Sequence, residues 1–253
     1  MTPIWVVLGS MSGAIIGSFI ATLILRWPAG RSVVSGRSHC DGCGRQLRAG
    51  ELVPIVSFVA SGGRCRSCNA AIPRFHPIVE LCAAALGGLA LWLAPDLRGI
   101  ALALLWWQLL TIALLDARHL WLPDRLNMVL AASGLALGGF LLGPPLLDRM
   151  IGGLAGFAVL ALVAAGYRRF RGRDGLGGGD PKLLGAIGCW LGWTALAPVV
   201  LIAALIGLGV AIAGRKDRFD ALPFGTFLAA SGLLWSGLQL ARALTQAAGI
   251  ERN

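Results

Sequence analysis

Charged and polar residues are scarce in this sequence. Only 13% of its 253 residues are charged, whereas 57% are hydrophobic, and the mean hydropathy is +0.76. A sequence of this composition has too few polar residues to cover the surface of a water-soluble globular protein of the same length, and it therefore excludes that class of protein. The sequence also lacks an HExxH motif and a Ser, His and Asp set at one depth, which argues against zinc-dependent and serine hydrolases.

The hydrophobic residues form long blocks. A helix needs roughly 20 apolar residues to cross roughly 30 Å of hydrocarbon. The blocks lie at 3–25, 77–95, 99–115, 126–143, 150–166, 183–213 and 222–247. The sixth can hold two short spans that turn near Gly192 and Trp193. We therefore expect an all-α polytopic membrane protein with about eight transmembrane helices, the first a retained span and not a signal peptide.

The basic residues favour one topology. If the N-terminus lies outside, the cytoplasmic loops are 26–76, 116–125, 167–182 and 214–221, and these hold 18 of the 22 Lys and Arg residues. With this topology, the basic residues of the cytoplasmic loops account for the net charge of +10. The basic residues are dispersed over four loops without a basic helix or an aromatic stacking set, so we expect the lipid bilayer as a partner and no nucleic acid.

The segment at 26–76 is long and polar enough to fold outside the lipid. We therefore divide the chain into a first transmembrane helix at 1–25, a cytoplasmic loop domain at 26–76 and a transmembrane core at 77–253. A domain of about fifty residues is too small to be stabilised by a hydrophobic core alone, and it commonly needs a metal or disulfides.

The loop contains four cysteines in the pattern C-x2-C-x21-C-x2-C, namely Cys40, Cys43, Cys65 and Cys68. Two such pairs are typical of a tetrahedral zinc site. The alternatives are two disulfides, which a reducing cytosol would not maintain, and a redox-active pair, which does not explain the matched spacing. His39 could replace a ligand. We predict a structural, zinc-ribbon-like site, because four sulfur ligands leave no coordination position for substrate.

Two aspartates mark the ends of apolar segments. Asp116 follows LLTIALL and Asp180 lies in GLGGGDPKLLG, and the predicted topology places both at the cytoplasmic membrane face. Ionisable residues at such positions are functional candidates. Two adjacent carboxyl groups share one proton, so that one can act as a base on water while the other polarises a carbonyl, as in aspartic proteases.

The glycines before Asp180 allow another segment to approach its backbone closely, and these are Gly177, Gly178 and Gly179. Alternatively, the glycines form a flexible linker and Asp180 caps the helix that Pro181 begins. Capping explains Asp116 less well, because an acid at a helix C-terminus is at the unfavourable end of the helix dipole.

Six segments together resemble a known family, the type IV prepilin peptidases, which are bacterial membrane aspartyl proteases of the GxGD class. The segments are GSFIATLILRWPAG at 17–30, RSHCDGCGRQLRAGELVPIVSF at 37–58, GGRCRSCNAAIPRFHPIVEL at 62–81, LLDARHLWLPDRLN at 114–127, GGGDPKLLGAIG at 177–188 and LPFGTFLA at 222–229. The last resembles the family's P-F-G-P-x-L-A motif and includes Pro223. The sequence departs from the family pattern at Ala21, which replaces Asn, and at Asp41 and Thr226, which each replace Pro.

The resemblance implies that Asp116 and Asp180 are the catalytic pair, with the GxGD glycines in support. It implies an inner-membrane enzyme that removes the short basic leader of prepilins or pseudopilins at the cytoplasmic face, after a glycine. It also implies methylation of the new N-terminus with S-adenosylmethionine. No nucleotide fingerprint in the sequence locates that cofactor.

Other charged residues have two interpretations each. Asp124 either caps a helix or binds the basic leader, and Glu80 either receives a positive substrate group or pairs with an arginine of the loop. Lys182 either tunes the aspartates or faces lipid phosphates.

Two other functions remain open at this stage. One is a proton-coupled carrier that uses Asp116 and Asp180 as a relay, although a carrier should place its acids near mid-bilayer and show repeated halves. The other is a metal-dependent assembly subunit without chemistry, which leaves the shared depth of the two aspartates unexplained.

Overall fold

The computed structural model describes residues 2–33, 38–40, 42–214 and 222–250. Asp41 and most of the predicted basic loop at 214–221 lie outside these ranges. The chain divides into two compact units, Met1–Pro95 and Asp96–Asn253. This grouping places the segment at 77–95 with the first helix, whereas the sequence analysis assigned 77–253 to one core; the three predicted domains stay a prediction.

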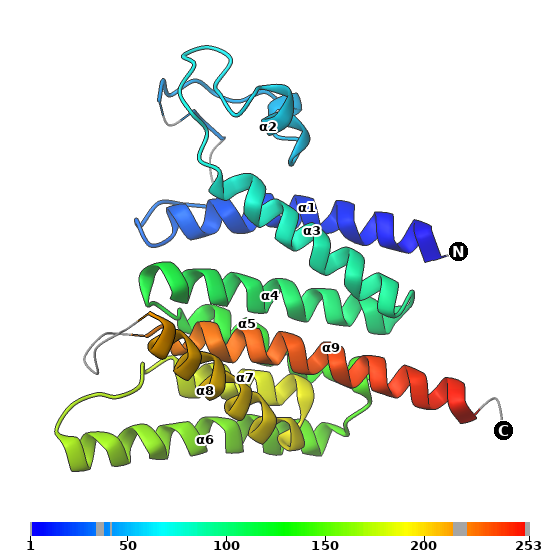
Figure 1. Ribbon diagram of the computed structural model, residues 1–253, viewed down its shortest axis with the longest axis vertical. Helices are drawn as coiled ribbons and strands as arrows, with labels where there is room; N and C mark the ends of the chain where they lie inside the picture. Colours follow the sequence, from blue (N-terminus) through cyan, green and yellow to red (C-terminus); the bar gives the residue numbers. More distant parts are fainter. Residues whose placement is uncertain (1, 34–37, 41, 215–221, 251–253) are drawn as a thin grey trace. The chain divides into compact units, whose positions relative to one another are not determined.

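The first unit consists of two long helices and a loop between them (Figure 1). Its elements are α1 (Thr2–Arg26), η1 (Ala49–Glu51), α2 (Val56–Ala60) and α3 (Phe75–Leu93). The loop at 27–74 contains short turns and two isolated β-bridges, His39 with Gln46 and Arg64 with Ala71.

Glycines on one face of α1 bring α3 close. Gly9, Gly13 and Gly17 recur at every fourth position and therefore share a face. A Cβ at Gly13 would overlap the backbone carbonyl of Ala83, and one at Gly17 would lie 2.7 Å from the Cα of Glu80. Such close packing of small residues is how helices associate in lipid. It also fixes Glu80 beside the C-terminal half of α1.

The second unit is a helical bundle (Figure 1). Its elements are α4 (Leu97–His119), α5 (Asp124–Leu142), α6 (Leu146–Arg171), α7 (Asp180–Leu191), η2 (Trp193–Ala195), α8 (Leu196–Ala213) and α9 (Phe224–Ile250). Every residue of α7 except Lys182 is buried, and α5, α6 and α9 pack around it. A Cβ at Gly188 of α7 would overlap the Gly152 carbonyl of α6, so small residues again set the helix separation.

Among the described residues, six helices are long and apolar enough to cross a membrane: α1, α3, α4, α6, α9 and the segment Trp193–Ala213. The all-α membrane fold is confirmed, but the predicted count of about eight crossings is not. The other two predicted spans correspond to α5 and α7. With 12 residues, α7 extends only about 18 Å, which is shorter than the hydrocarbon core.

Candidate active site and metal site

Asp116 lies in the last turn of α4, which continues to His119 and ends at Leu120 in a left-handed conformation. The residue is only 5% exposed. The backbone N–H of Thr226, in the first turn of α9, donates a hydrogen bond of 2.7 Å to Asp116 Oδ2. The first N–H groups of a helix have no partner within the helix, so the start of α9 can bind a carboxylate in this way.

Asp180 begins α7 and is 4% exposed. Gly179 occupies the N-cap position without a side-chain hydrogen bond, and Pro181 stands in the first turn. Asp180 Oδ2 instead accepts a hydrogen bond of 3.0 Å from the backbone N–H of Gly177. The carboxylate thus closes the glycine turn that precedes α7, which differs from the capping role considered above.

Leu122 packs against Gly179, which precedes Asp180, and against Gly225 of α9, which lies beside Asp116. A Cβ at Gly179, beside Asp180, would overlap the Cβ of Leu122. A Cβ at Gly225 would lie 2.7 Å from Leu122 Cδ1 and 3.1 Å from Asp116 Oδ2. The two glycines therefore allow the close approach that the sequence led us to expect around Asp180. Through these contacts with Leu122, Asp116 and Asp180 lie at the same end of the second unit.

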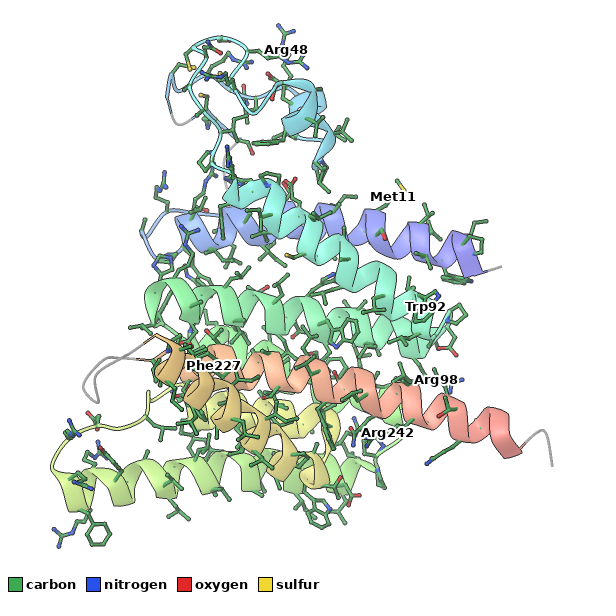
Figure 2. All side chains as sticks on the ribbon, viewed as in Figure 1. Met11, Arg48, Trp92, Arg98, Phe227 and Arg242 are labelled. Atoms are coloured by element: carbon green, nitrogen blue, oxygen red, sulfur yellow. The ribbon has the colours of Figure 1, made fainter. Side chains whose placement is uncertain are left out.

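Thr226 is the residue of this site whose role the sequence analysis missed. It was noted only as a departure from a family proline, and a proline has no N–H to donate to Asp116. The Thr226 hydroxyl also lies 3.1 Å from Asp116 Oδ2 and 3.0 Å from the Ala113 carbonyl oxygen, so its proton can go to either acceptor. Figure 2 labels the adjacent Phe227, near the start of α9, with Arg242 towards the other end of the helix.

The remaining charged candidates have specific partners. Lys182 Nζ lies 2.6 Å from Asp124 Oδ1, in an exposed ion pair that joins the starts of α7 and α5. Such a pair contributes about 0–1 kcal/mol to stability. Glu80 Oε2 accepts a hydrogen bond of 2.7 Å from the backbone N–H of Ile55. In the described part of the chain Glu80 has no arginine within ion-pair distance, so the predicted pairing with a loop arginine is not observed there.

The four loop cysteines form one cluster, with all four Sγ atoms within 4.8 Å of one another. The backbone around the two pairs is closely similar. The Cys40 carbonyl accepts from Gly44 N, and the Cys65 carbonyl accepts from Asn69 N. Gly44 and Asn69 both have a positive φ, of 68° and 59°. Each pair therefore sits on the same tight turn, and the two turns face each other.

The donor set of the cluster fits a metal ion. Backbone N–H groups of Cys68 and Ser67 lower the pKa of the Cys65 thiol to about 6, whereas burial and hydrogen bonds with the other cysteines raise the pKa of the Cys68 thiol to about 11. Without a metal the cluster therefore favours one thiolate, and a bound metal ion would displace the remaining protons. The cysteines are free thiols, and His39 does not belong to the cluster. The residues thus agree with the predicted tetrahedral site of four sulfur ligands, and the identity of the metal stays a prediction.

Two family profiles match the chain. Residues 11–94 match the bacterial peptidase A24 N-terminal domain, and residues 102–212 match the type IV leader peptidase family. The prepilin leader peptidase/N-methyltransferase of Pseudomonas aeruginosa is 38% identical over 87% of this chain and 78% of its own length. The chain belongs to the type IV leader peptidase family. The resemblance drawn from the sequence motifs is therefore confirmed.

Other members of the type IV leader peptidase family cover much of the chain. The protein of the same name from Burkholderia pseudomallei is 40% identical over 81% of this chain and 68% of its own. That of Neisseria gonorrhoeae is 31% identical over 92% of this chain and 90% of its own. No solved structure matches. Nothing in these comparisons supports the alternative of a proton-coupled carrier.

The two profiles of this family member fall on different units. The N-terminal profile lies in the first unit and contains the four cysteines, whereas the leader peptidase profile lies in the second and contains Asp116 and Asp180. The two candidate sites therefore belong to different compact units of the chain.

Proposed function

We propose that this protein removes the leader peptide of type IV prepilins or pseudopilins, after a glycine, and methylates the new N-terminus. Membership of the type IV leader peptidase family and the names of its relatives support this function. The observation that carries the peptidase assignment is the pair of buried aspartates from separate helices at one end of the second unit.

The two carboxyl groups have different roles in peptide hydrolysis. One, as a carboxylate, takes a proton from a water molecule while the water oxygen bonds to the scissile carbonyl carbon. The other, protonated, donates a hydrogen bond to the carbonyl oxygen, and the leaving nitrogen receives a proton as the C–N bond breaks. The hydrogen bonds from Thr226 and Gly177 hold the two groups in position for these transfers.

Positions beside the aspartates suit an extended substrate. The glycine turn at 177–179 has little side-chain bulk, and a Cβ at Gly178 would meet no atom within 4 Å. The Asp124 carboxylate is 62% exposed and lies at the start of α5, where a basic residue of the leader can compete with Lys182 for it. Pro223 precedes α9 and its carbonyl accepts from Thr226 N, so it shapes the turn that presents Thr226.

Six apolar helices and the family fit a multi-pass protein of the bacterial inner membrane. We place the aspartates and the cysteine loop at the cytoplasmic face because the basic residues concentrate there in the predicted topology. Zinc held by Cys40, Cys43, Cys65 and Cys68 would fold the loop and would take no part in hydrolysis, because all four ligand positions are occupied by sulfur.

The direct test uses purified protein in nanodiscs, a prepilin peptide with its leader, and methyl-labelled S-adenosylmethionine. We expect one cut after the glycine and label on the new N-terminus, measured by mass spectrometry and scintillation counting. A matched peptide with valine in place of that glycine should be cut much more slowly. Failure to cut the glycine peptide, or equal cutting of both, would contradict the proposal.

Thr226 provides a test of how Asp116 is positioned. Thr226→Pro removes the N–H donor, and Thr226→Val removes only the hydroxyl. A hydrogen bond to a charged group is worth about 1.5–3 kcal/mol, so we expect Thr226→Pro to lower kcat by at least roughly tenfold with little change in KM. Thr226→Val should have a smaller effect, and Thr226→Ser should retain activity. A rise in KM at constant kcat would show that Thr226 binds substrate and does not position Asp116.

A further inference from the structure

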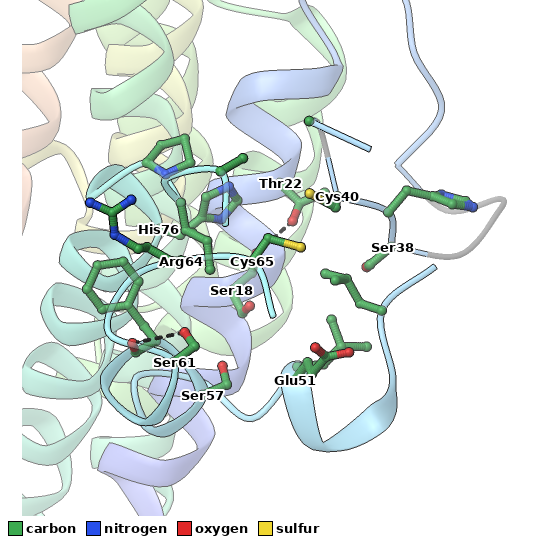
Figure 3. A pocket seen from close by; sticks show the side chains of 18 of the residues that line it. Ser18, Thr22, Ser38, Cys40, Glu51, Ser57, Ser61, Arg64, Cys65 and His76 are labelled. Carbon is green, nitrogen blue, oxygen red and sulfur yellow. Dashed lines mark hydrogen bonds between the residues drawn. The ribbon is translucent and has the colours of Figure 1, made fainter. Parts of the chain in front are cut away.

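Each of the two units contains a cavity. That of the first unit, of about 440 Å³, lies between α1 and the cysteine loop, and Figure 3 shows Cys40 and Cys65 on its wall. It therefore adjoins the metal site described above. The second unit has an open pocket of about 360 Å³, formed by the loop after α5, the end of α7 and the later part of α9. None of its described lining residues takes part in the proposed hydrolysis.

One face of α9 supplies most of the polar groups of this pocket. Its lining residues there recur at intervals of three or four, which places them on one side of a helix. They are Trp235, Gln239, Arg242 and Gln246. Figure 2 shows Arg242 in the later part of α9, whereas Asp116 contacts the first turn of the same helix. The pocket therefore lies at the end of the second unit opposite to the two aspartates.

Two polar atoms of this wall are buried without a hydrogen-bond partner in the described part of the chain. They are Trp235 Nε1, which is a donor, and Gln239 Oε1, which is an acceptor. Buried polar groups in proteins are nearly always paired, because an unpaired one costs free energy. A ligand that both accepts and donates hydrogen bonds would satisfy the two atoms together.

The pocket also carries a positive charge. Arg242 is exposed and forms no ion pair among the residues that the structure describes. None of the described lining residues is acidic, and Thr194 adds a hydroxyl to the wall. A guanidinium binds phosphate oxygens through two parallel hydrogen bonds. The charge therefore favours a ligand with a phosphate group.

The surroundings of the pocket are those of a membrane border. Arg242 lies in the last two turns of the apolar segment Phe224–Ala247, which is the depth at which lipid headgroups meet the hydrocarbon. Leu234 and Leu238, on the neighbouring face of α9, are 51% and 50% exposed. A phosphate ligand at this place can thus continue into an apolar chain that lies against the two leucines.

We propose that this pocket binds an anionic phospholipid whose headgroup carries hydroxyl groups, as phosphatidylglycerol does. Arg242 binds the phosphate, Trp235 Nε1 donates to a lipid oxygen, and a headgroup hydroxyl donates to Gln239 Oε1. The acyl chains lie along Leu234 and Leu238. The predicted topology puts this end of the unit at the outer face, so the lipid comes from the outer leaflet. By joining α9 to the loop after α5 and to the end of α7, the bound lipid stabilises the folded unit.

The test compares two lipids added to the full-length, metal-loaded protein in neutral detergent, by native mass spectrometry. Phosphatidylcholine has neither a net charge nor a headgroup hydroxyl, so we expect phosphatidylglycerol to bind at least roughly tenfold more tightly and to raise the melting temperature more. Arg242→Gln should weaken binding of phosphatidylglycerol at least roughly tenfold. Trp235→Phe keeps an aromatic ring but removes the N–H, and it should weaken binding by a smaller factor.

Arg98→Gln is the matched control. Arg98 is another exposed arginine, at the start of α4 (Figure 2), but it pairs with Asp96 at 3.1 Å and does not line the pocket. This variant should bind phosphatidylglycerol like the unaltered protein, and circular dichroism should show the same helix content in all variants. Equal affinity for the two lipids, or unchanged affinity in both Arg242→Gln and Trp235→Phe, would overturn the proposal. Displacement of the lipid by millimolar inorganic phosphate would also overturn it, because it would identify free phosphate as the ligand.

Discussion

Replacing either Asp116 or Asp180 with Asn is expected to lower the rate of leader cleavage by on the order of 10³-fold or more. Asn has nearly the same shape as Asp, but it can neither take a proton from water nor give one to the leaving group, and each step needs both carboxyl groups. The measurement is the initial rate of cleavage of a prepilin peptide by protein in nanodiscs. Both variants should insert into the membrane, because an uncharged amide is easier to bury than a carboxylate.

The matched control for these variants is Asp174→Asn. Asp174 precedes the same glycine turn as Asp180, but its side chain is 78% exposed and its contact with Arg168 is long, at 3.8 Å. This variant should cut the leader at close to the normal rate. Cleavage that survives in Asp116→Asn or Asp180→Asn would refute the aspartate pair as the catalytic centre.

Replacing Cys65 with Ser is expected to reduce bound zinc from about one atom per chain to nearly none and to unfold the cysteine loop. A structural zinc site supplies about 10–16 kcal/mol of apparent binding energy in small zinc domains, and the loop lacks a large core of its own. Cys65 is the buried member of the cluster. Zinc can be measured by mass spectrometry of the metal, and loop folding by the rate of limited proteolysis.

Cys82→Ser is the control for the metal site, because Cys82 is an exposed residue of α3 outside the cluster. It should retain zinc and resist proteolysis as the unaltered protein does. A loop that is folded without metal, or one that contains disulfides after purification under reducing conditions, would contradict the zinc assignment. Chelation should reproduce the effect of Cys65→Ser without any mutation.

Local sequence patterns predicted much of the cysteine site and of the turn before Asp180. The C-x2-C spacing already requires a tight turn with both sulfurs on one side, and the structure forms that turn twice. The glycines before Asp180 predicted a close approach, and Leu122 provides it. The same patterns did not give the number of crossings, because α7 is a buried helix shorter than the membrane, and its apolar run continues directly into the next helix.

The partners of the charged residues could not be read from the sequence. Thr226 lies 110 residues beyond Asp116, and Lys182 lies 58 residues beyond Asp124. Ile55 is an apolar residue whose backbone, and not its side chain, binds Glu80. A backbone donor can belong to any residue type, so the sequence contains no signal for it.

By itself, the sequence determined the membrane class and the helical segments, and it predicted the cysteine site and the two acids, because hydrophobic runs and short spacings act within a few turns of one chain segment. The tertiary structure decided which groups touch these acids: Thr226 on Asp116, Gly177 on Asp180, Ile55 on Glu80. The physical reason is that all but the second of these contacts join distant segments, and that the second depends on a turn whose glycines allow many conformations until Leu122 packs against it.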